Sequence, residues 1–249
     1  MTKRATPCVA VVLRRTDWHE TSRIVTLVTR DFGRRSFLAK GAHRPRSPFL
    51  GALDTLHVIE ARVRVHEGRG LQIIDAARVL QGNRPFRDDG LRHGLAMHLS
   101  EVITVAMPEA RADPELFDLY RGGLALFRTA PHHAMPTITA ALLLRACRVL
   151  GVLADLERCA MTFDALPEQG SIGFSASEGG FVREAQTGRR VDARLPGLAR
   201  ALLSTEGRAL EKRQDDPRAV QRLLVLVHEL LWTQLGEEPR TSLPPSLLL

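Results

Sequence analysis

The sequence has few cysteines: Cys8, Cys147 and Cys159 are the only three among 249 residues. They are widely spaced and odd in number, which argues against a disulfide framework and favours a reducing compartment. No apolar run approaches the roughly 18–20 residues that cross a bilayer. The first apolar run is also broken at Arg14, too early for a secretory signal. We therefore expect a cytoplasmic protein.

The sequence also lacks the motifs of common catalytic and metal sites. It has no nucleophile elbow, no P-loop and no His-Glu-x-x-His pattern. No two cysteines are separated by two residues, and the histidines do not have zinc spacing. The acidic pairs Asp88-Asp89 and Asp215-Asp216 have the character of helix starts. We therefore predict a protein that is not an enzyme and holds no metal.

Acidic residues are scarce in the first third of the chain. Residues 1–80 contain 15 lysines and arginines against 7 aspartates and glutamates, whereas the remainder has 20 against 21. The hydrophobic fraction of 44% excludes a disordered chain. A positive charge concentrated on a small domain indicates a polyanionic partner. The alternative is a basic surface that is simply solvated.

The same region predicts a small barrel of five antiparallel strands. Short β-branched runs are bordered by basic residues, and turn signals at Asp31-Phe32-Gly33 and Glu67–Gly70 separate two of the pairs. The expected strands are Val9–Leu13, Ile24–Thr29, Ser36–Lys40, Leu56–Val65 and Leu71–Arg78. We therefore assign residues 1–80 to an all-β domain.

The remainder predicts an all-α domain over residues 81–238. Apolar residues follow a helical period from Asp88, and Asp113-Pro114 and Asp216-Pro217 are helix-start signals. Further helices are expected over about 136–150 and 196–204. Glycine-rich residues at about 155–195 predict a small irregular insert, and the proline-containing tail 239–249 is expected to be extended.

The candidate binding face lies on the basic barrel. Phosphates require several cations along a groove, and single strands also require an apolar platform on which bases stack. Trp18 is the expected platform and Phe49 a second one; alternatively, Trp18 is a core or rim residue. The predicted nucleic-acid-binding residues are Arg14, Arg15, Trp18, Arg23, Arg34, Arg35, Lys40, Arg44 and Arg46. Any single arginine among them can instead be a solvated surface charge.

These residues resemble a known family. Residues 11–74, and most specifically Ala39-Lys40-Gly41-Ala42 followed by Arg44-Pro45-Arg46, resemble the start of the RecO DNA repair proteins. The resemblance is weaker but consistent through the helices. It implies an oligonucleotide-binding (OB) fold followed by a helical domain. It also implies a nucleoid-associated mediator that binds single- and double-stranded DNA, anneals strands and, with RecR, helps load RecA on DNA coated by the single-strand-binding protein (SSB).

The sequence departs from this family at one place. Many RecO proteins carry a four-cysteine zinc knuckle in the helical domain, but here only Cys159 stands at a ligand position. Thr162, Arg183 and Gln186 stand near the other three. One thiolate cannot hold a structural zinc ion, which requires four ligands. We predict a zinc-free insert, stabilised by packing of Phe163, Phe174 and Phe181.

The helical domain is nearly neutral, so we expect it to bind proteins. Arg121, Leu124 and Arg128 are spaced to share one helix face that can receive the acidic C-terminal tail of SSB. The alternative at these positions is an ordinary amphipathic helix. Other partners that the resemblance implies are RecR and RecA/RecF pathway proteins. Two rival functions are an interaction scaffold that does not bind DNA and an accessory subunit of a nucleic-acid enzyme.

Overall fold

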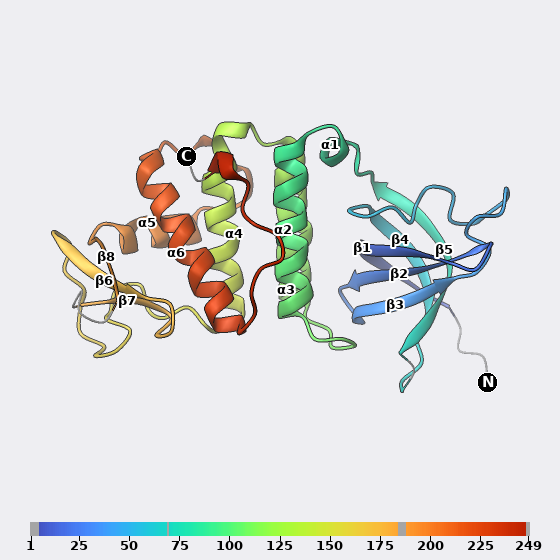
Figure 1. The fold of residues 1–249 in the computed structure, drawn as a ribbon, viewed down its shortest axis with the longest axis horizontal. Coiled ribbons are helices and arrows are strands. Elements are labelled where there is room, and N and C mark those ends of the chain that lie inside the picture. Colours follow the sequence, from blue (N-terminus) through green and yellow to red (C-terminus); the bar gives the residue numbers. More distant parts are fainter. Residues whose placement is uncertain (1–4, 69, 184–187, 248–249) are drawn as a thin grey trace. The chain divides into compact units, whose positions relative to one another are not determined.

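The computed structural model describes residues 5–68, 70–183 and 188–247. The chain forms two compact units, residues 1–121 and 122–249, and helix α3 (Pro114–Thr129) runs across the division. The first unit contains a barrel and the second contains helices and a small sheet (Figure 1).

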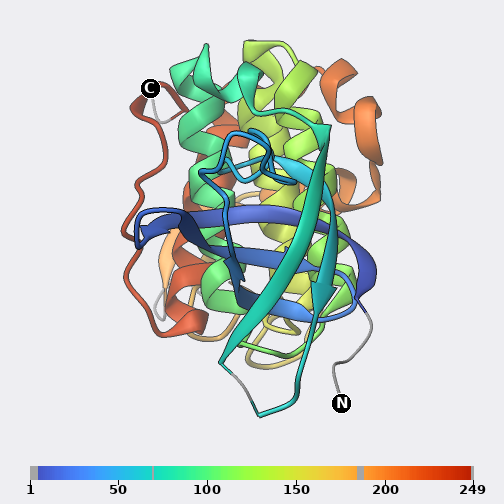
Figure 2. The same ribbon diagram turned by 90° about the vertical axis from the view of Figure 1, so that its right-hand side faces the viewer.

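The first unit begins with a closed five-stranded barrel (Figure 2). The strands occur in the order β1-β2-β3-β5-β4, and β4 closes the barrel against β1. The pairing of β3 with β5 is parallel and the other pairings are antiparallel. This topology is that of an OB-fold and confirms the expected fold class, but the expectation that all five strands are antiparallel is wrong for β3 and β5. The strands are β1 (Thr6–Trp18), β2 (Ser22–Thr29), β3 (Gly33–Ala39), β4 (Val58–Arg64) and β5 (Leu71–Gln81).

The barrel core is built by alternation along the strands. Val25, Leu27 and Phe37 are completely buried, whereas their neighbours in the sequence point to the other face. Strand β1 is longer than the sequence predicted, because the register shifts between Val12 and Arg14 and the strand then continues. Asp17 and Trp18 therefore belong to β1.

The long β3–β4 loop closes one end of the barrel. Phe49, Ala52 and Leu53 belong to the barrel core, and the Leu56 N–H donates to the Val12 carbonyl over 2.8 Å. Phe49 is only 3% exposed, so the expectation that it offers a second stacking platform is wrong. The loop is thus a fixed part of the barrel surface.

Helices follow the barrel in the first unit. The short α1 (Arg84–Arg87) precedes α2 (Gly90–Ala106), whose N-terminal residues are capped by the Asp89 carboxylate. Asp113 caps α3 in the same way, by accepting from the Leu116 N–H over 3.0 Å. Both helix starts were expected from these acids.

The second unit is mainly helical, as predicted. Helix α4 (Met135–Val149) packs against α5 (Leu195–Ser204) and α6 (Pro217–Leu235). Gly236 ends α6 with a φ of 67°, a left-handed cap that glycine adopts without strain. Short 3-10 helices are His132–Ala134, Gly207–Lys212 and Pro245–Leu247. In the C-terminal tail, Leu243 and Leu247 are buried.

The insert forms a three-stranded sheet in the order β7-β6-β8. Its strands are β6 (Ser171–Ser175), β7 (Gly180–Val182) and β8 (Arg189–Asp192). The rings of Phe174 and Phe181 meet edge to face, with centroids 5.3 Å apart, and both are buried. Phe163 is 69% exposed, so its expected packing in the insert is wrong.

Candidate nucleic-acid interface

The outer surface of strands β1, β2 and β3 carries part of the candidate interface. Thr26 pairs with Arg14 on one side and Ser36 on the other, and its hydroxyl lies 3.4 Å from that of Ser36. Ile24 pairs in the same way with Thr16 and Leu38. Because side chains alternate along a strand, these residues point away from the core. The outer surface therefore combines a cation, hydroxyls and apolar side chains.

Trp18 lies at the end of this surface, opposite Ser22 in the ladder. Trp18 is 47% exposed, and its ring is nearly perpendicular to that of His19, with centroids 5.0 Å apart. An exposed indole offers a flat face to a base. Trp18 is thus not a core residue, and stacking on it stays a prediction.

Three exposed cations follow on the β3–β4 loop, and we call Lys40, Arg44 and Arg46 the loop cations. The loop begins beside the β1–β2 turn, because the His43 N–H donates to the Thr21 carbonyl over 3.1 Å. The loop cations therefore start at the end of the outer surface where Trp18 lies. In the part of the chain that the structure describes, neither they nor Arg14 form an ion pair.

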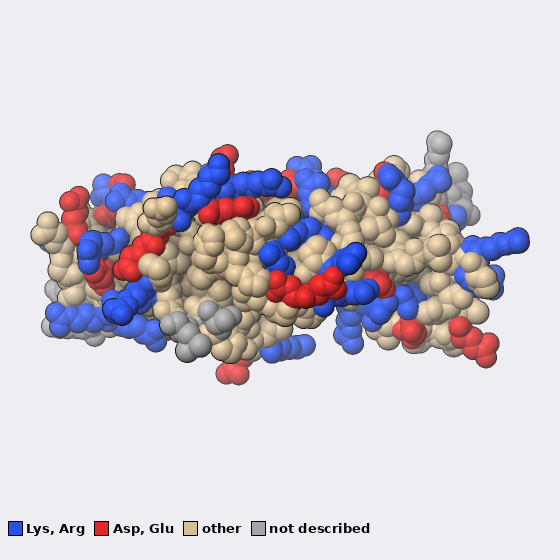
Figure 3. All heavy atoms as spheres, turned by 90° about the horizontal axis from the view of Figure 1, so that it is seen from above, with Lys and Arg blue, Asp and Glu red and all other residues tan. Residues whose placement is uncertain are grey.

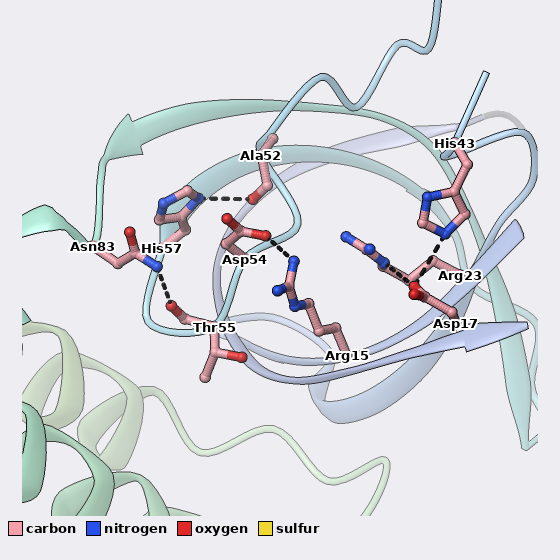
Figure 4. A network of polar contacts seen from close by, with 9 residues as sticks. All are labelled: Arg15, Asp17, Arg23, His43, Ala52, Asp54, Thr55, His57 and Asn83. Carbon is pink, nitrogen blue, oxygen red and sulfur yellow. Dashed lines mark hydrogen bonds and ion pairs between the residues drawn. The ribbon is translucent and has the colours of Figure 1, made fainter. Parts of the chain in front are cut away.

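Arg15 and Arg23 lie on the same two strands, β1 and β2, but each has an acidic partner (Figure 4). Arg15 forms an ion pair with Asp54, and the Arg23 Nε donates to the Asp17 carboxylate over 2.7 Å. The side chain of His43 lies 3.0 Å from the same carboxylate oxygen. The hydrogen bond from Arg23 lowers the pKa of Asp17, so this carboxylate remains negative at neutral pH. Both arginines are therefore already partly neutralised.

Arg34 and Arg35 lie at the opposite end of β3 and donate hydrogen bonds to the backbone. The Nε of Arg34 donates to the Met107 carbonyl over 3.2 Å, and a terminal nitrogen of Arg35 donates to the Ala110 carbonyl over 3.3 Å. The Ala110 N–H in turn donates to the Arg34 carbonyl over 2.9 Å. These two arginines hold residues 107–113 on the β2–β3 turn. The sequence predicted that they contact DNA, which no observation tests; because the bonds give them a structural role, we do not include them in the proposed DNA-binding face.

Gly33 explains how closely this segment approaches the turn. Its φ is 67°, and a Cβ atom there would overlap the carbonyl oxygen of Arg111. Only glycine meets both conditions without displacing the segment. The β2–β3 turn is therefore a docking point within the first unit and not a free basic loop.

Ion pairs reduce the positive charge of the barrel further. On the face of the molecule in Figure 3, basic and acidic side chains are interspersed instead of gathered into one basic patch. Three more barrel arginines have acidic partners, in the pairs Arg30–Asp118, Arg64–Asp75 and Arg78–Glu60. Exposed Arg62 on β4, which sequence reasoning did not select, has none among the described residues.

The face predicted to receive a peptide tail is not available as expected. Leu124 is completely buried, so the apolar centre of that face does not reach solvent, and this prediction is wrong. Burial also lowers the pKa of Arg128, and Arg121 lies 4.0 Å from the Asp118 carboxylate. The helical spacing was right and Arg121 is exposed, but Leu124 between the two arginines packs inward.

Cys159 is buried and surrounded by hydrogen-bond donors. Burial alone would raise its pKa, but donors from Thr162, Arg183 and Met161 lower the pKa below its usual range. The Arg183 N–H lies 3.3 Å from the sulfur. The Thr162 hydroxyl and the Arg183 side chain both contact the Asp164 carboxylate, at 2.9 Å and 3.6 Å.

These contacts decide whether zinc fits the insert. Thr162 and Arg183 supply no thiolate, and Gln186 lies outside the described residues. Within the described ranges, no group of three or more histidines, cysteines or acids could hold a metal ion. The residues that the structure places there therefore do not fit a zinc ion.

No helix in the described chain has both the length and the apolar character that a membrane span requires.

Comparison with known proteins assigns a family to both parts of the chain. The profile described as "Recombination protein O N terminal" matches residues 3–83. The profile described as "Recombination protein O C terminal" matches residues 87–244.

Individual relatives agree with the profiles. The DNA repair protein RecO of Anaeromyxobacter dehalogenans (strain 2CP-C) is 34% identical over 170 residues, which are 68% of this chain and 66% of that protein. The DNA repair protein RecO of Rhodopirellula baltica is 31% identical over 177 residues, which are 71% of this chain and 65% of that protein. The chain thus spans just under two thirds of the length of these relatives. Since the two profiles match nearly the whole chain, it belongs to the RecO family of DNA repair and recombination proteins.

Proposed function

We propose that this protein binds single- and double-stranded DNA through its barrel and promotes the annealing of complementary strands. The observation that carries the proposal is a group of cations that form no ion pair among the described residues, beside an exposed tryptophan: Arg14, Trp18, Lys40, Arg44 and Arg46. The names of its relatives, DNA repair protein RecO, support the assignment to DNA.

The proposed mechanism is electrostatic. Cations at the barrel surface neutralise phosphates, and two polyanionic strands then approach one another with less repulsion. Trp18 contributes a stacking platform for an unpaired base, worth about 1–3 kcal/mol if a base occupies it. Neither step changes a covalent bond, so we propose that the protein is not an enzyme.

The salt dependence of binding tests this proposal. If about 5 phosphates of a single strand are contacted, the slope of log K against log salt is about −3.5. The affinity for a labelled single strand should then fall roughly a hundredfold between 50 and 200 mM salt. An affinity that does not depend on salt, or the absence of binding at 50 mM, would contradict the proposal and favour a scaffold that does not bind DNA.

We further propose that the protein acts with RecR to help load RecA on SSB-coated DNA, in the cytoplasm and at the nucleoid. This second proposal rests on the assignment of the chain to the RecO family. Gel-shift measurements on SSB-coated single strands, with and without RecR, test it. With RecR, the coated strand should form a complex that migrates more slowly in the gel and supports RecA loading. An identical pattern of bands with and without RecR would contradict the proposal.

For the SSB tail, a groove in the second unit replaces the buried face of α3 as the proposed site. Its cavity has a volume of about 480 Å³, and its lining includes three arginines from β8 and α6. Val225 and Leu226 supply an apolar floor. Cations around an apolar floor suit an acidic peptide with apolar side chains. The three arginines are Arg189, Arg190 and Arg222; Arg189 is paired with Glu229 at 3.3 Å and Asp192 also lines the groove, so Arg190 and Arg222 are the cations proposed to meet the peptide.

Peptide binding tests the groove. Arg190→Ala/Arg222→Ala should weaken binding of a labelled acidic tail peptide at least about tenfold, because two charge-assisted contacts are lost. Arg121→Ala is the matched control and should bind as the wild type does. Equal affinity of both variants and the wild type would exclude the groove.

We also propose that the insert folds without zinc. Hydrogen bonds to the Cys159 sulfur and the buried Phe174–Phe181 pair hold it together instead. Metal analysis of the purified protein should find well under one zinc per chain. About one zinc per chain, lost together with the fold on chelation, would contradict the proposal.

A further inference from the structure

Leu50 is the most exposed large apolar side chain of the barrel, at 84% of its surface. In contrast, the nearby Phe49 and Ala52 are buried, at 3% and 1% exposure, and belong to the barrel core. Isolated exposed leucines are common on protein surfaces. The position of this one, at the tip of a basic loop, distinguishes it.

The loop is built so that Leu50 cannot turn inward. The Ala52 N–H donates to the Phe49 carbonyl over 2.6 Å, which closes a β-turn with Leu50 and Gly51 at its centre. Gly51 has a φ of 67°, as the third position of a type II turn requires. On the other side, the Ala77 N–H of β5 donates to the Pro48 carbonyl over 3.4 Å. Core residues and β5 therefore hold both sides of the tip.

Cations precede the tip in the same loop. Arg44 and Arg46 are exposed, and the Ser47 N–H donates to the Arg44 carbonyl over 3.0 Å, which keeps this part of the loop compact. The Ser47 hydroxyl then accepts from the Phe49 N–H over 3.2 Å. The loop thus presents two positive side chains and then one apolar side chain within a few residues. The complementary partner has negative charge outside and apolar surface within reach.

We propose that Leu50 inserts as a wedge between neighbouring bases of bound DNA while Arg44 and Arg46 hold the flanking phosphates. Apolar wedges of this kind, leucine among them, unstack base steps in other DNA-binding proteins. In DNA, the negative phosphates lie outside and the stacked bases lie within. The phosphates match Arg44 and Arg46, and the bases match Leu50. The inference rests on the proposed DNA binding and adds to it a residue that contacts bases.

The test compares Leu50→Ala with Leu80→Ala, a control at another exposed leucine of the barrel that is 42% exposed. Affinity for a single strand containing 2-aminopurine is measured over 50–200 mM salt, together with the fluorescence of that base. Leu50→Ala should lower affinity about tenfold and abolish the fluorescence change. Its salt slope should stay as in the wild type, because no phosphate contact is lost. Leu80→Ala should match the wild type in affinity, in the fluorescence change and in the salt slope.

Two further results decide the inference. Leu50→Phe keeps an apolar wedge and should retain affinity, which guards against loss through a misfolded loop. If the wild type binds DNA with a steep salt slope and Leu50→Ala binds equally well, the wedge is excluded and DNA binding stands. If the wild type does not bind DNA, the proposed function itself fails. Reduced binding of RecR or of lipid vesicles by Leu50→Ala, with DNA affinity unchanged, also overturns the wedge.

Discussion

The two ends of strand β3 carry similar charge but use it differently. At its start, Arg34 and Arg35 donate to backbone carbonyls of residues 107–110. Past its end, the loop cations Lys40, Arg44 and Arg46 form no ion pair among the described residues. A guanidinium has five N–H donors, and those that already meet fixed carbonyls are not available to a phosphate and also hold the group in place. Positive charge in a sequence therefore indicates a binding face only once the contacts of each basic side chain within the protein are known.

The largest expected effect is that of Gly33→Ala at the start of β3. The new Cβ atom would overlap the Arg111 carbonyl oxygen and would also impose a left-handed conformation on alanine. We expect the free energy of unfolding to fall by about 3–5 kcal/mol, measured by urea denaturation.

Gly51→Ala, in the loop past the other end, is the matched control for Gly33→Ala. Gly51 has the same φ of 67°, but no atom lies within 4 Å of the position of its Cβ. We expect a loss of only about 1–2 kcal/mol from backbone strain. Equal losses in the two variants would mean that the contact with residues 107–113 does not constrain the turn.

The next effect is that of Lys40→Ala/Arg44→Ala/Arg46→Ala on DNA affinity. Each cation that contacts a phosphate contributes about 0.7 log units to single-strand binding at 0.1 M salt. Removal of all three should weaken binding about a hundredfold, or about 2.8 kcal/mol, as measured by fluorescence anisotropy. The midpoint of unfolding should not move. An affinity within twofold of the wild type would remove the loop from the interface.

A smaller effect is expected for Arg34→Ala/Arg35→Ala. Loss of hydrogen bonds from two guanidinium groups to partly buried carbonyls should lower the free energy of unfolding by about 1–2 kcal/mol. Urea denaturation measures this loss. DNA affinity, measured on the folded protein, should change by less than about twofold. A tenfold loss of affinity with unchanged stability would return both arginines to the DNA-binding face.

The smallest effect is expected for Arg62→Ala on β4. Arg62 is exposed and has no acidic partner among the described residues, but it lies outside β1–β3 and the loop. We expect neither stability nor DNA affinity to change by more than about twofold, in the same two assays. A larger loss of affinity would extend the binding face onto β4.

The fold was largely predictable because its signals are local. Alternation in β4, turn residues at Asp31–Gly33, and the capping residues Asp113 and Asp216 indicated elements close to those observed. The extension of β1 to Trp18 was missed, because the bulge after Val12 breaks a simple period of two. The short α1 was also missed, since one turn of helix has no measurable period.

The candidate site was less predictable because it depends on contacts between distant residues. The sequence marks Arg23 and Arg34 equally as basic residues in a basic region. Only the fold shows that one pairs with Asp17 and that the other donates to Met107. Leu50 was missed for the opposite reason, since an apolar residue beside Phe49 reads as part of the core. The glycine after it, a signal for a turn, could have indicated its exposure.

A comparison of salt slopes decides whether phosphates are bound by the loop cations and not by Arg34 and Arg35. Single-strand affinity is measured from 50 to 200 mM salt for the wild type, for Lys40→Ala/Arg44→Ala/Arg46→Ala and for Arg34→Ala/Arg35→Ala. We predict that the slope of log K against log salt becomes shallower by about 2 in the first variant and stays unchanged in the second. A slope unchanged in the first variant, or shallower in the second, would contradict it.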